Sequence, residues 1–204
     1  TRVEGIIDGE VVENFINEAI QEKNINYINE LKSKKLAIAT VDTISMKECV
    51  FASENVLDTS KQSNYITDIS IGKAVRASMA FPAIFTTANY KNYNFIDGGT
   101  VDNLPVEVLR KWGASKVIAI CFDLNKYSPS NSLEGVLIRA LDIFSNPAVQ
   151  KAKEFSDVAI EIYNPNTSLL SMDEMEKTVQ NGYDAVMSKK EKILEILQND
   201  DANV

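Results

Sequence analysis

The residues best suited to chemistry are Asp97, Gly98 and Gly99, which directly follow a strand-like run at residues 93–96. An acid at the end of a strand, followed by two glycines and a helix start, can hold a carboxylate at the rim of a sheet, facing a cleft. The tripeptide also fits an ordinary turn, because an Asp side chain bonds to nearby backbone and glycine tolerates positive φ. The functional alternative is a general base, which requires the pKa of Asp97 to rise above the value of about 3.9 for a free Asp. An apolar, desolvated pocket would raise it, with Phe95, Ile96 and residues 81–85 as its walls.

The composition removes the commonest partners of such a group. Histidine is absent from the 204 residues, so no Ser-His-Asp or Cys-His pair can form within the chain. Zinc sites lose their commonest nitrogen ligand, and residues 123–125 do not fill the pattern of a calcium loop. We therefore expect no metal and no cofactor, and any hydrolysis needs a base other than histidine.

The charge and the cysteines limit the partners and the compartment. The net charge of −8, from 21 basic and 29 acidic residues, argues against nucleic acid as a partner and gives no attraction to an anionic membrane. Contact with a lipid surface is therefore expected to be apolar, local and transient. The first residues carry neither a signal peptide nor an initiator methionine, which suggests a processed or trimmed product. Cys49 and Cys121 are expected as buried free thiols, which favours a cytoplasmic location and leaves secretion of the full-length protein open.

The apolar pattern predicts an alternation of strands and helices. Strands are expected at residues 35–41, 48–53, 93–96, 116–122 and 158–163, and helices at 11–20, 71–80, 103–112, 133–144, 148–155 and 173–197. Ser70 and Asn103 are expected as helix caps, Gly113 as a helix stop and Gly182 as a helix break, with residues 54–68 as a loop. We predict one α/β domain over residues 1–204, with a mixed, largely parallel sheet and helices on both faces.

Two motifs make the reading more specific. Residues 77–85 match the pattern A-S-x-A-x-P-x-x-F, and Asp97-Gly98-Gly99 match D-G-G. Asn103-Leu104-Pro105 and Gly113-Ala114 follow before the next strand. In these motifs the chain resembles the C-terminal part of the patatin-like phospholipase domain. The resemblance is strongest over residues 71–123, looser over 35–53, and weak at both ends.

The resemblance implies a histidine-free Ser-Asp dyad that hydrolyses phospholipids or related acyl esters. Asp97 would be its catalytic aspartate, with Gly98, Gly99 and Asn103 as the supporting motif. The family's serine lies in a G-x-S-x-G elbow near the start of the domain, and neither this motif nor the glycine-rich oxyanion loop occurs in these 204 residues. We therefore expect the nucleophile and the N-terminal part of the fold to lie outside this chain, which would be inactive alone. The exposed sheet edge would favour self-association, or binding of the missing N-terminal segment.

Several other interpretations stay open at this stage. Ser78 lacks flanking glycines and is expected to be a small packing residue rather than a nucleophile. Asp102 fits a helix start, and Gly98-Gly99 also fits an anion-binding turn of a phosphate-binding protein. Met172 and Met175, with Leu169 and Leu170, are expected in the core rather than over an acyl chain. The rival function is a non-catalytic, patatin-like pseudoenzyme or interaction module.

Overall fold

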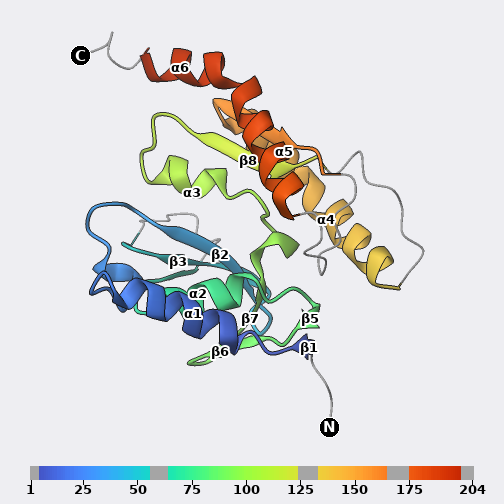
Figure 1. Ribbon diagram of the computed structural model, residues 1–204. Coiled ribbons are helices and arrows are strands. Elements are labelled where there is room, and N and C mark those ends of the chain that lie inside the picture. The colour runs from blue at the N-terminus through green and yellow to red at the C-terminus, as the bar shows by residue number, and fades with distance from the viewer. Residues whose placement is uncertain (1–4, 56–63, 124–132, 165–174, 199–204) are drawn as a thin grey trace. The chain divides into compact units, whose positions relative to one another are not determined.

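The computed structural model describes residues 5–55, 64–123, 133–164 and 175–198 (Figure 1). These residues belong to two compact units, Thr1–Asn103 and Leu104–Val204, and each unit is described by itself below. The expectation that the whole chain forms one domain stays a prediction.

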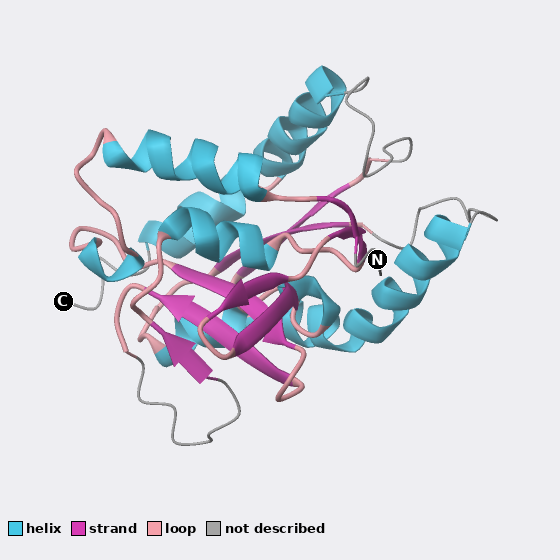
Figure 2. Ribbon diagram, turned by 90° about the horizontal axis from the view of Figure 1, so that it is seen from below, coloured by secondary structure: helices cyan, strands magenta, loops and turns pink. Residues whose placement is uncertain are grey.

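The first unit is built on a five-stranded sheet with the strand order β4-β3-β2-β7-β6. The pair β3/β4 is parallel, whereas β2/β3, β2/β7 and β6/β7 are antiparallel. A separate parallel pair joins β1 to β5. The strands, magenta in Figure 2, are β1 (Gly5–Ile7), β2 (Ala37–Asp42), β3 (Lys47–Ala52), β4 (Asn64–Ile66), β5 (Ala83–Phe85), β6 (Ala88–Tyr90) and β7 (Tyr93–Asp97).

The mixed α/β class is confirmed, but the balance of strand directions differs from the expectation. Residues 43–46 connect β2 to β3, and residues 91 and 92 connect β6 to β7. Connections this short can only reverse the chain, since a parallel neighbour needs a crossover of a dozen or more residues. Met46 and Lys91 adopt φ values of 55° and 52° in these turns. The five-stranded sheet is therefore mostly antiparallel, and β4 lies inside the segment that was expected to be a loop.

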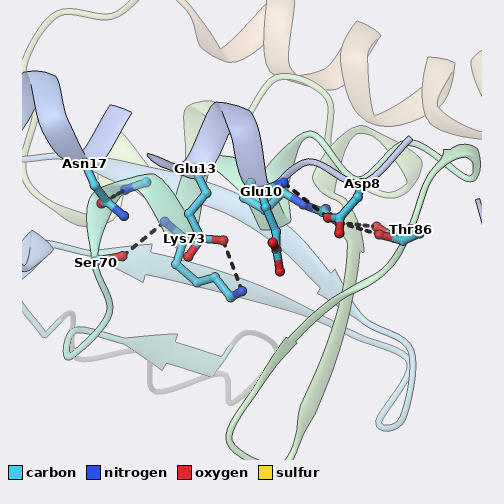
Figure 3. A network of polar contacts seen from close by, with 9 residues as sticks. Asp8, Glu10, Glu13, Asn17, Ser70, Lys73 and Thr86 are labelled. Carbon is cyan, nitrogen blue, oxygen red and sulfur yellow. Dashed lines mark hydrogen bonds and ion pairs between the residues drawn. The ribbon is translucent and has the colours of Figure 1, made fainter. Parts of the chain in front are cut away.

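Two helices of the first unit, α1 (Glu10–Gln21) and α2 (Ile71–Ser78), lie side by side, and α2 packs on β2 and β7 (Figure 1). Both helices agree with the predicted segments. The backbone N–H of Gly72 donates to Asn17 Oδ1 at 3.0 Å, and Lys73 pairs with Glu13 at 3.1 Å (Figure 3). A Cβ on Gly72 would lie 2.3 Å from the carbonyl oxygen of Glu13. This close crossing therefore depends on glycine.

The core of the first unit lies between α2 and the sheet. Phe51 and Phe95 are fully buried and meet edge to face, with ring centroids 5.0 Å apart. Ala74 and Ala77 of α2 belong to the same apolar cluster. Their small side chains allow the helix to approach the strands closely, because a core at crystal-like density has no room for larger ones at the same spacing.

Arg76, near the end of α2, contacts residues that directly follow β1 and β5. Its side chain is 4% exposed, and its Nη2 donates to the carbonyl oxygen and the hydroxyl of Thr86 at 2.8 and 2.7 Å. Asp8 lies 3.9 Å from the same nitrogen (Figure 3). The stem of Arg76 lies over Gly9, where a Cβ would come within 2.2 Å of it. The arginine therefore joins α2 to the ends of both β1 and β5.

In the part of the second unit that the structure describes, there are a parallel strand pair and four helices. Its core comprises Leu104, Val106, Val117, Ala119, Val149 and Ala152. The helix α3 ends as expected, with Gly113 just beyond it at φ 84°. The elements are α3 (Val106–Lys111), β8 (Ile118–Phe122), α4 (Leu133–Phe155), β9 (Val158–Ile162), α5 (Met175–Ser188) and α6 (Lys190–Gln198).

Three expected helix boundaries in this half of the chain were wrong. Asn103 does not cap α3, whose first turn begins after Pro105 without a side-chain cap. Pro147 lies inside α4 instead of between two helices, and the burial of Val149 and Ala152 just beyond it offsets the hydrogen bond that proline removes. The helix break falls between α5 and α6 rather than at Gly182, where an added Cβ would lie 3.8 Å from the side chain of Ile162 of β9. In both cases tertiary packing outweighs a local helix-breaking residue.

The cap of α2 gives a direct test of this description. The N–H of Lys73 donates to Ser70 Oγ at 3.2 Å, so Ser70→Ala leaves a helix-end donor without its acceptor. Such a change costs about 1 kcal/mol, and we expect the free energy of unfolding, measured in urea, to fall by that amount. Ser70→Asp retains an acceptor and should keep most of the stability. Equal losses in the two variants would show that Ser70 does not act as a cap.

Candidate active site

Asp97 is the last residue of β7, and the chain turns directly after it. Its Oδ1 accepts a hydrogen bond of 2.7 Å from the N–H of Gly99, and the hydroxyl of Thr100 donates to its carbonyl oxygen at 2.8 Å. These bonds close a short 3-10 helix, η2 (Gly98–Thr100), onto the strand end. The side chain is thus held at the carboxyl end of a strand, as the sequence predicts. Asp97 forms the turn that one interpretation expected, and this turn is compatible with the role of a general base.

The backbone of Asp97 is fixed by elements far apart in the sequence. Its N–H donates to the carbonyl oxygen of Ala80, just beyond α2, at 3.0 Å. On β2, Thr40 lies directly opposite Asp97 in the antiparallel register. Gly98 packs closely against the backbone of β2, since a Cβ on Gly98 would lie 2.4 Å from the carbonyl oxygen of Ala39. The first glycine of the motif is therefore required by close packing against β2.

Burial raises the pKa of the Asp97 carboxyl above its usual range, and the hydrogen bond from Gly99 opposes this effect. Phe95 precedes Asp97 by two residues, so the two side chains lie on the same face of β7, and Phe95 is fully buried. Ile96 points to the opposite face and does not form the wall that was expected of it. A carboxylate with a raised pKa can act as a base and return the proton afterwards.

A second strand-end acid in the same sheet is more deeply buried than the half-buried Asp97, but its pKa is shifted in the opposite direction. Asp42, at the end of β2, is 2% exposed and accepts hydrogen bonds from the N–H groups of Ile44, Ser45 and Asn94 and from the Ser45 hydroxyl, at 2.7–3.3 Å. Desolvation raises the pKa of Asp42, but these four donors outweigh it and leave the pKa below its usual value. Asp42 therefore stabilises the turn in its charged form. The sequence analysis did not identify Asp42. An Asp followed by Thr and Ser in a turn is nevertheless a sequence signal for hydrogen bonds between the carboxylate and the backbone N–H groups of the turn.

The remaining predicted residues lie near Asp97 in different ways. The side-chain oxygen of Asn103 would be 2.8 Å from a Cβ on Gly99, so its amide lies over that glycine. The N–H groups of Val101 and Asp102 both donate to the carbonyl oxygen of Gly98. The N–H of Gly99 already donates to Asp97 Oδ1 and is thus in use within the turn. The interpretation of Gly98-Gly99 as an anion-binding turn stays a prediction. Ser78 is the half-buried last residue of α2.

Other expected features fall elsewhere. Leu169, Leu170 and Met172 lie outside the described residues, and Met175 is 51% exposed rather than in the core. Cys49 is a buried free thiol, whereas Cys121 is half-buried. Within the described ranges, no group of three or more His, Cys, Asp or Glu side chains is placed to hold a metal ion. None of the helices in those ranges is both long and apolar enough to span a membrane.

An open pocket of about 410 Å³ lies at the ends of β3 and β4. Its lining is polar and comes from three segments of the first unit: Asn29, Glu30, Lys32, Ser53, Glu54, Asn55 and Thr67. Asp97 is not part of this lining, and β2 lies between β3 and β7 in the sheet. The pocket therefore does not define the environment of the candidate base.

Comparison with known families agrees with this geometry. A family model described as patatin-like phospholipase matches residues 2–110, more than half of the chain. The chain belongs to the patatin-like phospholipase family, a family of lipid hydrolases. The match includes Asp97 and extends to the N-terminal end, where the motifs alone gave a weak resemblance.

The close contact of Gly98 can be tested by adding a single methyl group. Gly98→Ala would place a Cβ against the backbone of Ala39, which cannot rotate away as a side chain would. Overpacking of this kind costs about 1–3 kcal/mol, to be measured as a lower free energy of unfolding. Gly182→Ala is the matched control, because its Cβ meets ordinary contact distances within α5 and gains up to about 1 kcal/mol of helix propensity. Tolerance of Gly98→Ala would contradict the packing of the motif on β2.

The contributions of Asp97 and Asp42 to stability should change with pH in opposite directions. The pKa of Asp97 is raised in the folded state, so ionisation of Asp97 lowers stability as the pH rises through the interval between its unfolded and folded values. Asp97→Asn should therefore be at least as stable as wild type at neutral pH, with any gain vanishing in acid. The pKa of Asp42 is lowered, so Asp42→Asn should lose stability at neutral pH and approach wild type as the pH falls through the folded pKa. Calorimetric Tm values across acidic to neutral pH check both signs, and a shared sign would refute the contrast.

Proposed function

We propose that this chain supplies the catalytic base of a phospholipase A-type lipid acyl hydrolase that works through a Ser-Asp dyad. The observation that carries the proposal is the half-buried carboxylate of Asp97, with its raised pKa, at a strand end within the D-G-G motif. Membership of a lipid hydrolase family and the absence of histidine from the sequence support the same assignment. The substrates are phospholipids or related acyl esters, and the reaction needs no cofactor.

In this mechanism the serine comes from a G-x-S-x-G segment outside these 204 residues. Its oxygen forms a bond to the ester carbonyl carbon as its proton passes to Asp97, and backbone N–H groups of a glycine-rich loop stabilise the oxyanion. Asp97 then gives the proton to the leaving alcohol, which departs as the acyl-serine forms. Water attacks the acyl-serine and Asp97 takes a proton from it. Release of the fatty acid restores the serine hydroxyl and the carboxylate.

The absence of a G-x-S-x-G motif from the sequence also favours a second candidate, a non-catalytic patatin-like module. The two candidates differ in whether the full-length gene product contains the elbow serine. In either case we expect the 204-residue chain to be inactive alone, and to associate with itself or with the segment that completes the sheet. A cytoplasmic location, transient contact with lipid surfaces and no binding of nucleic acid are the matching expectations for the compartment and partners.

The dyad is tested by Asp97→Asn in the full-length protein. The substitution keeps the shape and the acceptor for the Gly99 N–H but removes the base, so kcat for a short nitrophenyl ester should fall by about 10²–10⁴. In the wild-type protein, the acid limb of the pH profile of kcat/KM should report an apparent pKa above the usual range of an Asp, because the base must be ionised and its pKa is raised. Asp68→Asn, which changes an exposed acid paired with Lys91, is the control and should leave kcat unchanged.

A fluorophosphonate probe separates the two candidate functions. The full-length protein should be labelled at the elbow serine, whereas the 204-residue chain should not react. Absence of the serine, or of labelling, in the full-length protein would favour the non-catalytic module. Turnover by Asp97→Asn near the wild-type rate would refute the dyad.

A further inference from the structure

Thr40 is a fully buried polar residue in the middle of the five-stranded sheet. It lies on β2, the strand with β3 on one side and β7 on the other. A buried hydroxyl costs free energy unless it is hydrogen-bonded. A Val would fill the same space without that cost, so the hydroxyl of Thr40 calls for an explanation.

The hydroxyl bridges the two elements that hold Asp97. Thr40 Oγ1 donates to the carbonyl oxygen of Ile96, the residue before Asp97, at 2.8 Å. The carbonyl oxygen of Ala77, near the end of α2, lies 3.5 Å from the same hydroxyl. Because the hydroxyl has one proton, the short bond to Ile96 is the principal one, and the contact with Ala77 places the group on the α2 face of the sheet.

The register places the Thr40 side chain beside the carboxylate itself. Thr40 and Asp97 are directly opposite each other on antiparallel strands, so their side chains lie on the same face, with Cβ atoms about 5 Å apart. Gly98 lies flat on the neighbouring backbone of Ala39. Thr40 therefore adjoins Asp97 on the strand and also bonds to the peptide unit that carries it.

We propose that Thr40 is a positioning residue for Asp97, its hydroxyl fixing the strand end and its methyl group helping to keep water from the carboxylate. This inference rests on the proposed function of Asp97 as a base. The short hydrogen bond at Ile96 limits rotation of the peptide that precedes Asp97, while the N–H of Asp97 is held from the other side by Ala80. Serine would keep the hydroxyl and valine would keep the shape, so the two roles can be separated by substitution.

The test uses the full-length protein with Thr40→Val and Thr40→Ser, each assayed well below its Tm. Thr40→Val should lower kcat by about tenfold or more with little change in KM, since misplacement of a catalytic group affects the transition state rather than substrate binding. In Thr40→Val the acid limb of the pH profile of kcat/KM should move to lower pH, because access of water to the carboxylate lowers the pKa of Asp97. Thr40→Ser retains the donor and should keep kcat within about threefold of wild type.

Thr43→Val provides the matched control. The exposed Thr43 hydroxyl donates to Asn94 Oδ1 at 2.8 Å and lies 3.0 Å from the Asn94 carbonyl oxygen, so it also joins the β2 side to β7, but at the end of the strand pair remote from Asp97. Its loss should lower stability without changing kcat or the pH profile. Equal effects of Thr40→Val and Thr43→Val on kcat would overturn the positioning role.

Two further outcomes keep the inference falsifiable. If Thr40→Val does not fold, Thr40→Ser decides the question: retention of kcat supports a role for the hydroxyl, and a loss as large as that of Asp97→Asn overturns it. Wild-type turnover by Asp97→Asn would refute the proposed function itself. An inactive Asp97→Asn together with an unaffected, folded Thr40→Val would refute only the role of Thr40.

Discussion

The packing of α2 against β2 and β7 is the contact on which the first unit depends. It buries Phe95 beside Ala74 and Ala77, and it places the carbonyl oxygens of Ala77 and Ala80 next to the end of β7. The Ala80 carbonyl oxygen accepts a hydrogen bond from the N–H of Asp97, so the strand end that carries the carboxylate is tied to the residues just beyond α2.

The contrast between Asp42 and Asp97 shows how one fold gives two carboxylates different chemistry. Both are strand-end acids of adjacent strands and both lose water on folding. Asp42 regains four donors in its turn, so the charged form is favoured, whereas the bond from Gly99 does not compensate Asp97. The balance between desolvation and the donors that each carboxylate accepts decides which acid is poised to exchange a proton. A poorly compensated carboxylate reduces stability, as is common for functional groups.

Membership of the patatin-like phospholipase family connects these features to lipid hydrolysis. The family match ends at residue 110 and so spans the first unit and the start of the second. In the second unit, Arg110 bonds to the carbonyl oxygens of Ala114, Ser115 and Phe155 and pairs with Asp157 at 2.7 Å. These bonds join α3 to the connection between α4 and β9, so this half of the chain has a polar framework of its own.

The sequence by itself determined the mixed α/β class, the longer strands, the helices α1 and α2 with the cap at Ser70, and the place of Asp97 at a strand end. Each of these follows from local signals: apolar periodicity, capping residues and a motif that contains its own turn. The three-residue strands β4, β5 and β6 and the continuation of α4 through Pro147 were decided by tertiary structure, because partners distant in sequence outweigh weak or contrary local preferences. The raised pKa of Asp97 and the bridge made by Thr40 belong to the same class, since burial and strand register exist only in the folded chain.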